Sequence, residues 1–114
     1  MSKYIPHENL CKEIMLGVSQ AKLAILLPYE VGLYRMFNPP FKPINIGTPG
    51  VSDLVGFLLD GSSRWVSVEV KTGNAKLRES QIRFRAVVEK AGGIFIVGRS
   101  VQQVVLEITS AYRK

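Results

Sequence analysis

Two apolar segments joined by a Gly-Ser-Ser turn constrain the fold of this chain more than any other feature. Residues 53–60 read DLVGFLLD, and residues 64–71 read RWVSVEVK. Apolar runs of this length on either side of a short Gly-containing turn predict a β-hairpin. Because side chains alternate along a strand, the three valines of the second segment share one face. The opposite face is expected to carry Ser67, Glu69 and Lys71.

Periodicity in the rest of the chain predicts helices and strands in alternation. The expected helices are residues 8–20, 77–91 and a last helix capped by Ser100, with Gly92-Gly93 ending the second. The other expected strands are residues 23–27, 31–37 and 94–98. Residues 38–52 hold four prolines and two glycines and are expected to be irregular. This order predicts a single α/β domain over residues 1–114, with a mixed β-sheet flanked by α-helices and parallel pairing of residues 64–71 with 94–98.

Charge indicates the class of partner. Fifteen Lys and Arg residues against nine Asp and Glu residues give a net charge of +6. Such an excess favours a polyanionic partner such as nucleic acid, although a basic domain without such a partner is the alternative. A single cysteine excludes an internal disulfide framework, and residues 21–27 are too short an apolar run to span a bilayer. The N-terminus lacks the apolar core of a secretory signal, so an intracellular, cytoplasmic setting is expected.

Asp53 and Glu69 form the strongest chemical signal. A turn centred on Gly61 places Asp53 directly opposite Glu69, and opposed residues of an antiparallel pair face the same side of the sheet. Two carboxylates at this separation repel each other unless a cation lies between them. Mg²⁺ and Mn²⁺ take oxygen ligands of this kind. Lys71, on the same face, is expected to contact a substrate phosphate or an attacking water.

Gln81 interrupts the apolar stripe of the second helix. A buried amide needs a hydrogen-bond partner, which is either the backbone of the core or the site around Glu69. Basic residues flank the same stripe, and they are either solvated or in contact with a phosphate backbone. These candidate DNA-binding residues are Lys76, Arg78, Arg83 and Arg85. A Glu-x-Lys pair on a strand is more often an exposed ion pair, and His7 is more often a helix-start residue than a ligand.

Three segments of the chain together resemble a known nuclease family. The segments TPGVSDLVGF, VSVEVKTGNAKLRESQIRF and AGGIFIVGRS are similar to the VRR-NUC (virus-type replication–repair nuclease) family of the PD-(D/E)XK superfamily. The resemblance covers about residues 47–112 closely and the first helix more loosely. Family members often carry Arg-Asn before a Val-Gly pair where this chain reads PYEVG, so contact of that arm with substrate is not carried over.

The resemblance implies metal-dependent hydrolysis of DNA phosphodiesters. Carried over by position, Asp53, Glu69 and the carbonyl of Val70 would bind Mg²⁺ or Mn²⁺, Lys71 would be the catalytic lysine and Gln81 would support the site. A first-helix acid is assigned to Glu13, with Glu8 as the alternative. Short members, many of them from phages, resemble Holliday-junction resolvases, which implies a homodimer that cleaves branched DNA. The competing hypotheses are a metal-free DNA-binding module and a nuclease that reads base sequence.

Overall fold

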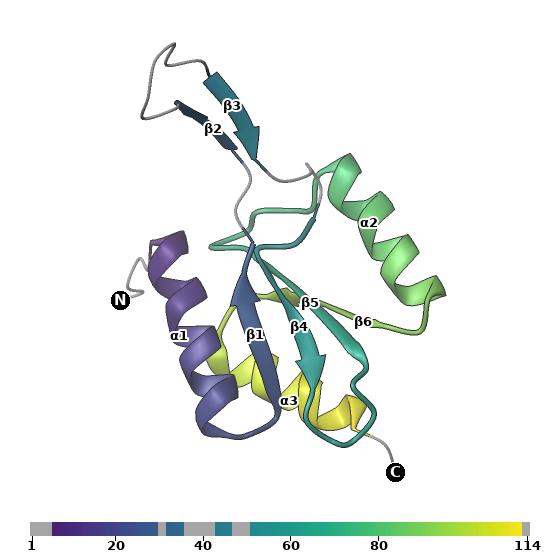
Figure 1. The fold of residues 1–114 in the computed structure, drawn as a ribbon. Helices are drawn as coiled ribbons and strands as arrows, with labels where there is room; N and C mark the ends of the chain where they lie inside the picture. The colour runs from purple at the N-terminus through teal and green to yellow at the C-terminus, as the bar shows by residue number, and fades with distance from the viewer. Residues whose placement is uncertain (1–5, 30–31, 36–42, 47–50, 113–114) are drawn as a thin grey trace.

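The apolar segments pair into one four-stranded sheet with strand order β1-β4-β5-β6 (Figure 1). A computed structural model of the chain describes residues 6–29, 32–35, 43–46 and 51–112. The strands of this sheet are β1 Ala24–Pro28, β4 Leu54–Leu58, β5 Trp65–Val70 and β6 Ile94–Gly98. β4 is antiparallel to both β1 and β5, whereas β5 and β6 are parallel. The predicted mixed sheet is therefore confirmed, together with the parallel pairing across the second helix.

The β4–β5 hairpin has the register that the turn sequence predicts. Leu54 pairs with Val68 and Phe57 pairs with Trp65, which centres the hairpin on Gly61. Gly61 has φ = 90° and Ser63 has φ = 56°, so the turn uses the left-handed region twice. This register matters for the site because one further step along the same ladder sets Asp53 against Glu69.

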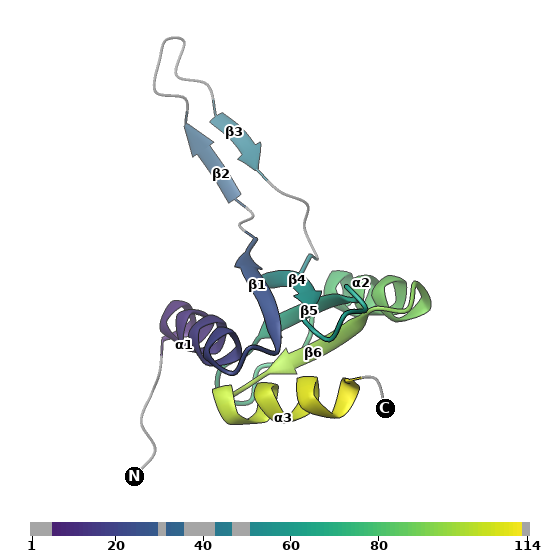
Figure 2. The same cartoon turned by 60° about the horizontal axis from the view of Figure 1, so that its bottom comes forward.

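Three helices cover the two faces of the sheet. They are α1 His7–Gln20, α2 Glu79–Lys90 and α3 Val101–Ala111. α1 and α3 pack on the face that carries the β5 valines, and their buried residues there include Ile14, Val18, Val104 and Ile108. α2 lies against the other face, where Gln81 contacts Glu69. Figures 1 and 2 show α2 well apart from the pair formed by α1 and α3.

Helix boundaries differ from the predicted ones by one or two residues. α1 begins at His7, one residue early, and α2 begins at Glu79 after an extended Arg78, two residues late. Ends of helices are the least specified part of a periodic pattern, because only the caps distinguish them. Ser100 caps α3 as predicted, since its hydroxyl oxygen accepts a hydrogen bond of 3.1 Å from the Gln103 N–H.

A second hairpin, β2 Gly32–Arg35 with β3 Pro43–Ile46, corrects one prediction. Residues 43–46 were expected to be irregular, but they form a strand in which Pro43 pairs with Arg35 at the end of the ladder. Proline is excluded from central strands and tolerated at the first residue of a strand, so its presence did not exclude this one. The described residues do not include the rest of the predicted strand 31–37. They also leave out residues 38–42 and 47–50 of the segment expected to be irregular. Figure 2 shows this hairpin extending beyond the four-stranded sheet.

No helix in the part of the chain that the structure describes could span a membrane. None of α1, α2 and α3 has both the length and the apolar character that crossing a bilayer requires.

Close packing of α1 against α3 generates a first prediction. A Cβ atom at Gly17 would lie only 2.4 Å from Cγ1 of Val101. We expect Gly17→Ala to lower the free energy of unfolding by about 1–2 kcal/mol, because overpacking outweighs the higher helix propensity of alanine. Urea denaturation measures this change. In a Val101→Ala background the same substitution is expected to be neutral or stabilising, and additive effects of the two substitutions would contradict the proposed clash.

Candidate functional site

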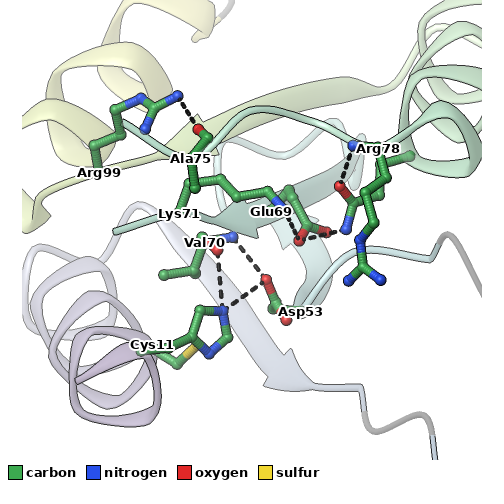
Figure 3. A network of polar contacts seen from close by, with 10 residues as sticks. Cys11, Asp53, Glu69, Val70, Lys71, Ala75, Arg78 and Arg99 are labelled. Atoms are coloured by element: carbon green, nitrogen blue, oxygen red, sulfur yellow. Dashed lines mark hydrogen bonds and ion pairs between the residues drawn. The ribbon is translucent and has the colours of Figure 1, made fainter. Parts of the chain in front are cut away.

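Asp53 and Glu69 lie next to each other at neighbouring ends of β4 and β5 (Figure 3). Asp53 directly precedes β4, and its Oδ2 accepts a hydrogen bond of 2.8 Å from the Val70 N–H. Glu69 is buried, with 4% of its surface exposed. Burial, the charge of Asp53 and a hydrogen bond between the two carboxyl groups raise the pKa of Glu69 to about 8, although Lys71 partly opposes this. The structure therefore forces two acids together where a proton or a cation must compensate them.

Lys71 forms a buried pair with Glu69, not the solvent-exposed pair that a Glu-x-Lys sequence usually makes. Its Nζ lies 3.6 Å from Glu69 Oε2, and the two side chains are 11% and 5% exposed. The main chain of Lys71 continues the sheet, because its N–H donates to the Gly98 carbonyl at 2.9 Å. Figure 3 shows the lysine side chain reaching along the strand end to the glutamate.

Gln81 joins the first turn of α2 to the acid pair. Its Nε2 donates a hydrogen bond of 3.0 Å to Glu69 Oε2, and its Oε1 accepts one of 2.8 Å from the Arg78 N–H. The Arg78 contact fixes this amide orientation, because a backbone N–H only donates and must therefore face the amide oxygen. Sequence left two partners open for this buried amide, the backbone and the site, and the structure shows both: the Arg78 N–H and Glu69.

His7 belongs to the site, although its sequence context favoured a plain helix start. Its Nε2 lies 3.0 Å from the carbonyl oxygen of Val70 and 3.3 Å from Asp53 Oδ2. Cys11 lies one turn along α1, with its Sγ 3.9 Å from His7 Nδ1. Atoms of His7, Cys11 and Asp53 that are able to ligate a metal all lie within 4.8 Å of one another. The spacing of four residues between His7 and Cys11 was the available sequence signal, since it places both on one flank of a helix.

Burial and two acidic neighbours act on the thiol of Cys11. Desolvation, followed by the charges of Asp53 and Glu69, raises the pKa of this thiol to about 12. Cys11 therefore stays protonated at neutral pH, and its sulfur is a weak hydrogen-bond acceptor instead of a thiolate.

Glu13 is not brought to the acid pair. It is exposed on α1, and no contact within the described residues joins it to Asp53 or Glu69. Glu13 lies two positions after Cys11, which corresponds to about 160° around the helix axis. Cys11 and His7 face the site, so Glu13 projects from the opposite flank of α1. Glu8 is also exposed and makes no such contact in the same described part of the chain.

The four predicted DNA-binding residues are exposed, but their surroundings differ. Arg83 pairs with Glu79 at 3.1 Å. Arg85 lies 3.4 Å from an oxygen of Glu89, and its guanidinium lies 5.8 Å from the centre of the Phe95 ring. The other two, Lys76 and Arg78, have no ion pair among the described residues. Both residues precede α2, and Arg78 is the better placed for binding an anion near Glu69, because its N–H bonds to the Gln81 side chain that contacts Glu69.

Arg99 fixes the loop between β5 and α2, a role that sequence reasoning missed. Its guanidinium donates to the carbonyl oxygens of Gly73 at 3.0 Å and of Ala75 at 2.7 Å. Both acceptors are backbone atoms, so no pattern of side chains indicated the contact. The loop that carries Lys76 is thereby held to the end of β6 (Figure 3).

The residues present at this site fit a divalent cation. Two carboxylates and the Val70 carbonyl supply oxygen donors, and His7 supplies a nitrogen within 3.3 Å of one of them. Ionised Glu69 beside Asp53 is unfavourable without positive charge, as the raised pKa of Glu69 records. A bound cation would supply that charge and displace the proton.

The raised pKa of Glu69 predicts how the metal-free protein responds to pH. The folded state keeps a proton up to a pKa of about 8, whereas the reference value for the unfolded chain is 4.5. The free energy of unfolding in EDTA is therefore expected to fall between pH 5 and 8, by at most about 1.4 kcal/mol per pH unit. Glu69→Gln should flatten this slope in urea denaturation. An equal slope in the variant would assign the pH dependence to other groups.

Comparison with known proteins adds no family assignment. No model of a protein family matches the chain, and a search of curated proteins also finds no match. The fold and the geometry of the acid pair are thus the basis for any functional conclusion.

Proposed function

We propose that this chain is a Mg²⁺- or Mn²⁺-dependent endonuclease that hydrolyses phosphodiester bonds in branched DNA such as Holliday junctions. The observation that carries the proposal is the buried Glu69 beside the partly exposed Asp53, with Lys71 Nζ 3.6 Å from Glu69 Oε2. Two adjacent acids with a buried ammonium are costly to a fold and are typical of sites that perform chemistry. The net charge of +6 favours a polyanionic substrate.

Asp53, Glu69 and the carbonyl oxygen of Val70 would hold the metal ion. When bound, the ion would supply Lewis-acid polarisation of the scissile phosphate and a lower pKa for a water ligand. Lys71 orients the attacking water or neutralises the charge that develops on the phosphate, because its Nζ is fixed beside Glu69. Gln81 keeps Glu69 in place through its hydrogen bond of 3.0 Å.

Membership of the VRR-NUC family is part of the proposal. It is supported by the mixed sheet, by the hairpin that presents the acids and by the helix that delivers Gln81. One domain supplies one such site, and a four-way junction has two-fold symmetry. We therefore propose that a homodimer acts on this substrate.

The catalytic assignment is tested on a synthetic four-way junction with Mn²⁺. We expect Glu69→Gln and Lys71→Ala each to lower the cleavage rate at least about a hundredfold, because the first weakens a proposed metal ligand and the second removes a positive charge beside the reacting phosphate. Glu79→Gln is the matched control, since Glu79 is an exposed acid that pairs only with Arg83 among the described residues. Full activity in either site variant would rule out the assignment. Titration calorimetry with Mn²⁺ distinguishes the nuclease from the alternative, a metal-free DNA-binding module. The alternative predicts that Mn²⁺ does not bind at the site.

The basic residues are expected to contribute unequally to DNA binding. Arg78→Ala should weaken binding and reduce the slope of log affinity against log salt by about one, because it removes one phosphate contact. Arg83→Ala is the matched comparison and should have the smaller effect, since Arg83 already pairs with Glu79. Fluorescence anisotropy at several salt concentrations measures both slopes. A larger effect for Arg83 would place the DNA along the opposite flank of α2.

A further inference from the structure

We propose that His7 is a direct metal ligand and that it shifts the preference of the site from Mg²⁺ toward first-row transition ions such as Zn²⁺ and Mn²⁺. This inference rests on the part of the proposed function in which Asp53 and Val70 hold a cation. It adds a ligand from α1 that the sequence did not indicate. Its consequence is a metal selectivity that two carboxylates and a carbonyl alone would not give.

The spacing of the donor atoms is the first argument. A transition-metal ion about 2.0–2.2 Å from its ligands sets neighbouring ligand atoms roughly 3.0–3.5 Å apart. His7 Nε2 lies 3.0 Å from the Val70 carbonyl oxygen and 3.3 Å from Asp53 Oδ2. These separations also suit a ring N–H that donates to both oxygens. The same three atoms can thus share either a proton on Nε2 or a metal ion in its place.

Cys11 provides the second argument through the tautomer of His7. When Nε2 binds a metal, the ring proton must move to Nδ1, which then needs an acceptor. The Sγ atom of Cys11 lies 3.9 Å from Nδ1, at the edge of the range for a weak N–H···S contact. Cys11 lies one turn after His7, on the side of the ring opposite the Nε2 contacts to Val70 and Asp53. Ligating histidines usually donate the second ring N–H to a carboxylate, a backbone carbonyl or a water, and the weaker acceptor Cys11 Sγ would take that place here.

The type of donor sets the expected selectivity. Mg²⁺ favours oxygen ligands in near-ideal octahedral geometry and gives up its waters reluctantly. Imidazole nitrogen favours transition ions, with Zn²⁺ bound more tightly than Mn²⁺ at a given site. Replacing one oxygen donor by His7 therefore strengthens binding of Zn²⁺ and Mn²⁺ and leaves Mg²⁺ with little gain.

His7 is the only histidine of the chain, which allows a direct measurement on the wild-type protein. Long-range ¹H–¹⁵N NMR spectra report the state of both ring nitrogens without any assignment ambiguity. On titration with Zn²⁺ we expect the Nε2 resonance to move to the value for metal-bound imidazole and Nδ1 to become the protonated nitrogen. Ring resonances unchanged at saturating Zn²⁺ would overturn the proposal.

Variants test the selectivity by calorimetry with each ion in turn. His7→Ala is expected to lower the affinities for Zn²⁺ and Mn²⁺ at least about tenfold and to change the affinity for Mg²⁺ less than about twofold. Glu13→Gln is the matched control on the same helix, because Glu13 is exposed and points away from the site. An equal loss for all three ions, or no loss for any of them, would overturn the proposal. A loss in Glu13→Gln equal to that in His7→Ala would do the same.

These measurements use no DNA, so they are separable from the nuclease assay. If junction DNA stays intact while Zn²⁺ shifts the His7 resonances, the proposed function fails and the ligand assignment stands. If Glu69→Gln abolishes cleavage while His7 does not respond to Zn²⁺, the function stands and the His7 assignment fails.

Discussion

The register of one β-hairpin brings the two acids of the candidate site together. Leu54 pairs with Val68, so the next position along the ladder brings Asp53 against Glu69. A slip of one residue would turn Glu69 toward the valine core and leave Asp53 without its neighbour. The left-handed residues of the turn, Gly61 and Ser63, set this register from the far end of the hairpin. Backbone geometry at the turn is thereby transmitted along the two strands to the acids.

Glu69 is stable in this position only because several elements supply it with partners. Gln81 reaches it from α2, Lys71 from the end of its own strand and Asp53 from the start of β4. Arg99 holds the connecting loop, which keeps the start of α2 close to the end of β5. The raised pKa of Glu69 records the electrostatic cost that remains after these contacts. A cation fits the site because it removes that cost.

The sequence allowed the sheet and the acid pair to be predicted, but not the whole site. Alternation in β5 and the length of its turn were sufficient for Asp53 and Glu69, since strand geometry leaves few registers that bury the valines. His7 was missed because its position at the site depends on how α1 lies across the sheet, and the His7–Cys11 spacing alone shows only that the two residues share one flank of a helix. Glu13 was preferred to Glu8 as the first-helix acid for the same reason. Helical periodicity identifies the buried stripe of α1, but it does not show which flank of the helix meets the ends of the strands. Pro43 misled the assignment of β3, because proline excludes central strands and not strand ends.

The two faces of β5 separate folding from chemistry. Val66, Val68 and Val70 point into the core between the sheet and the helices α1 and α3, whereas Glu69 faces α2 and the strand ends. Selection can therefore act on alternate positions of one strand almost independently. Drift at the acid positions would produce relatives that keep this architecture without the acid pair, and such a descendant is only one or two codons away.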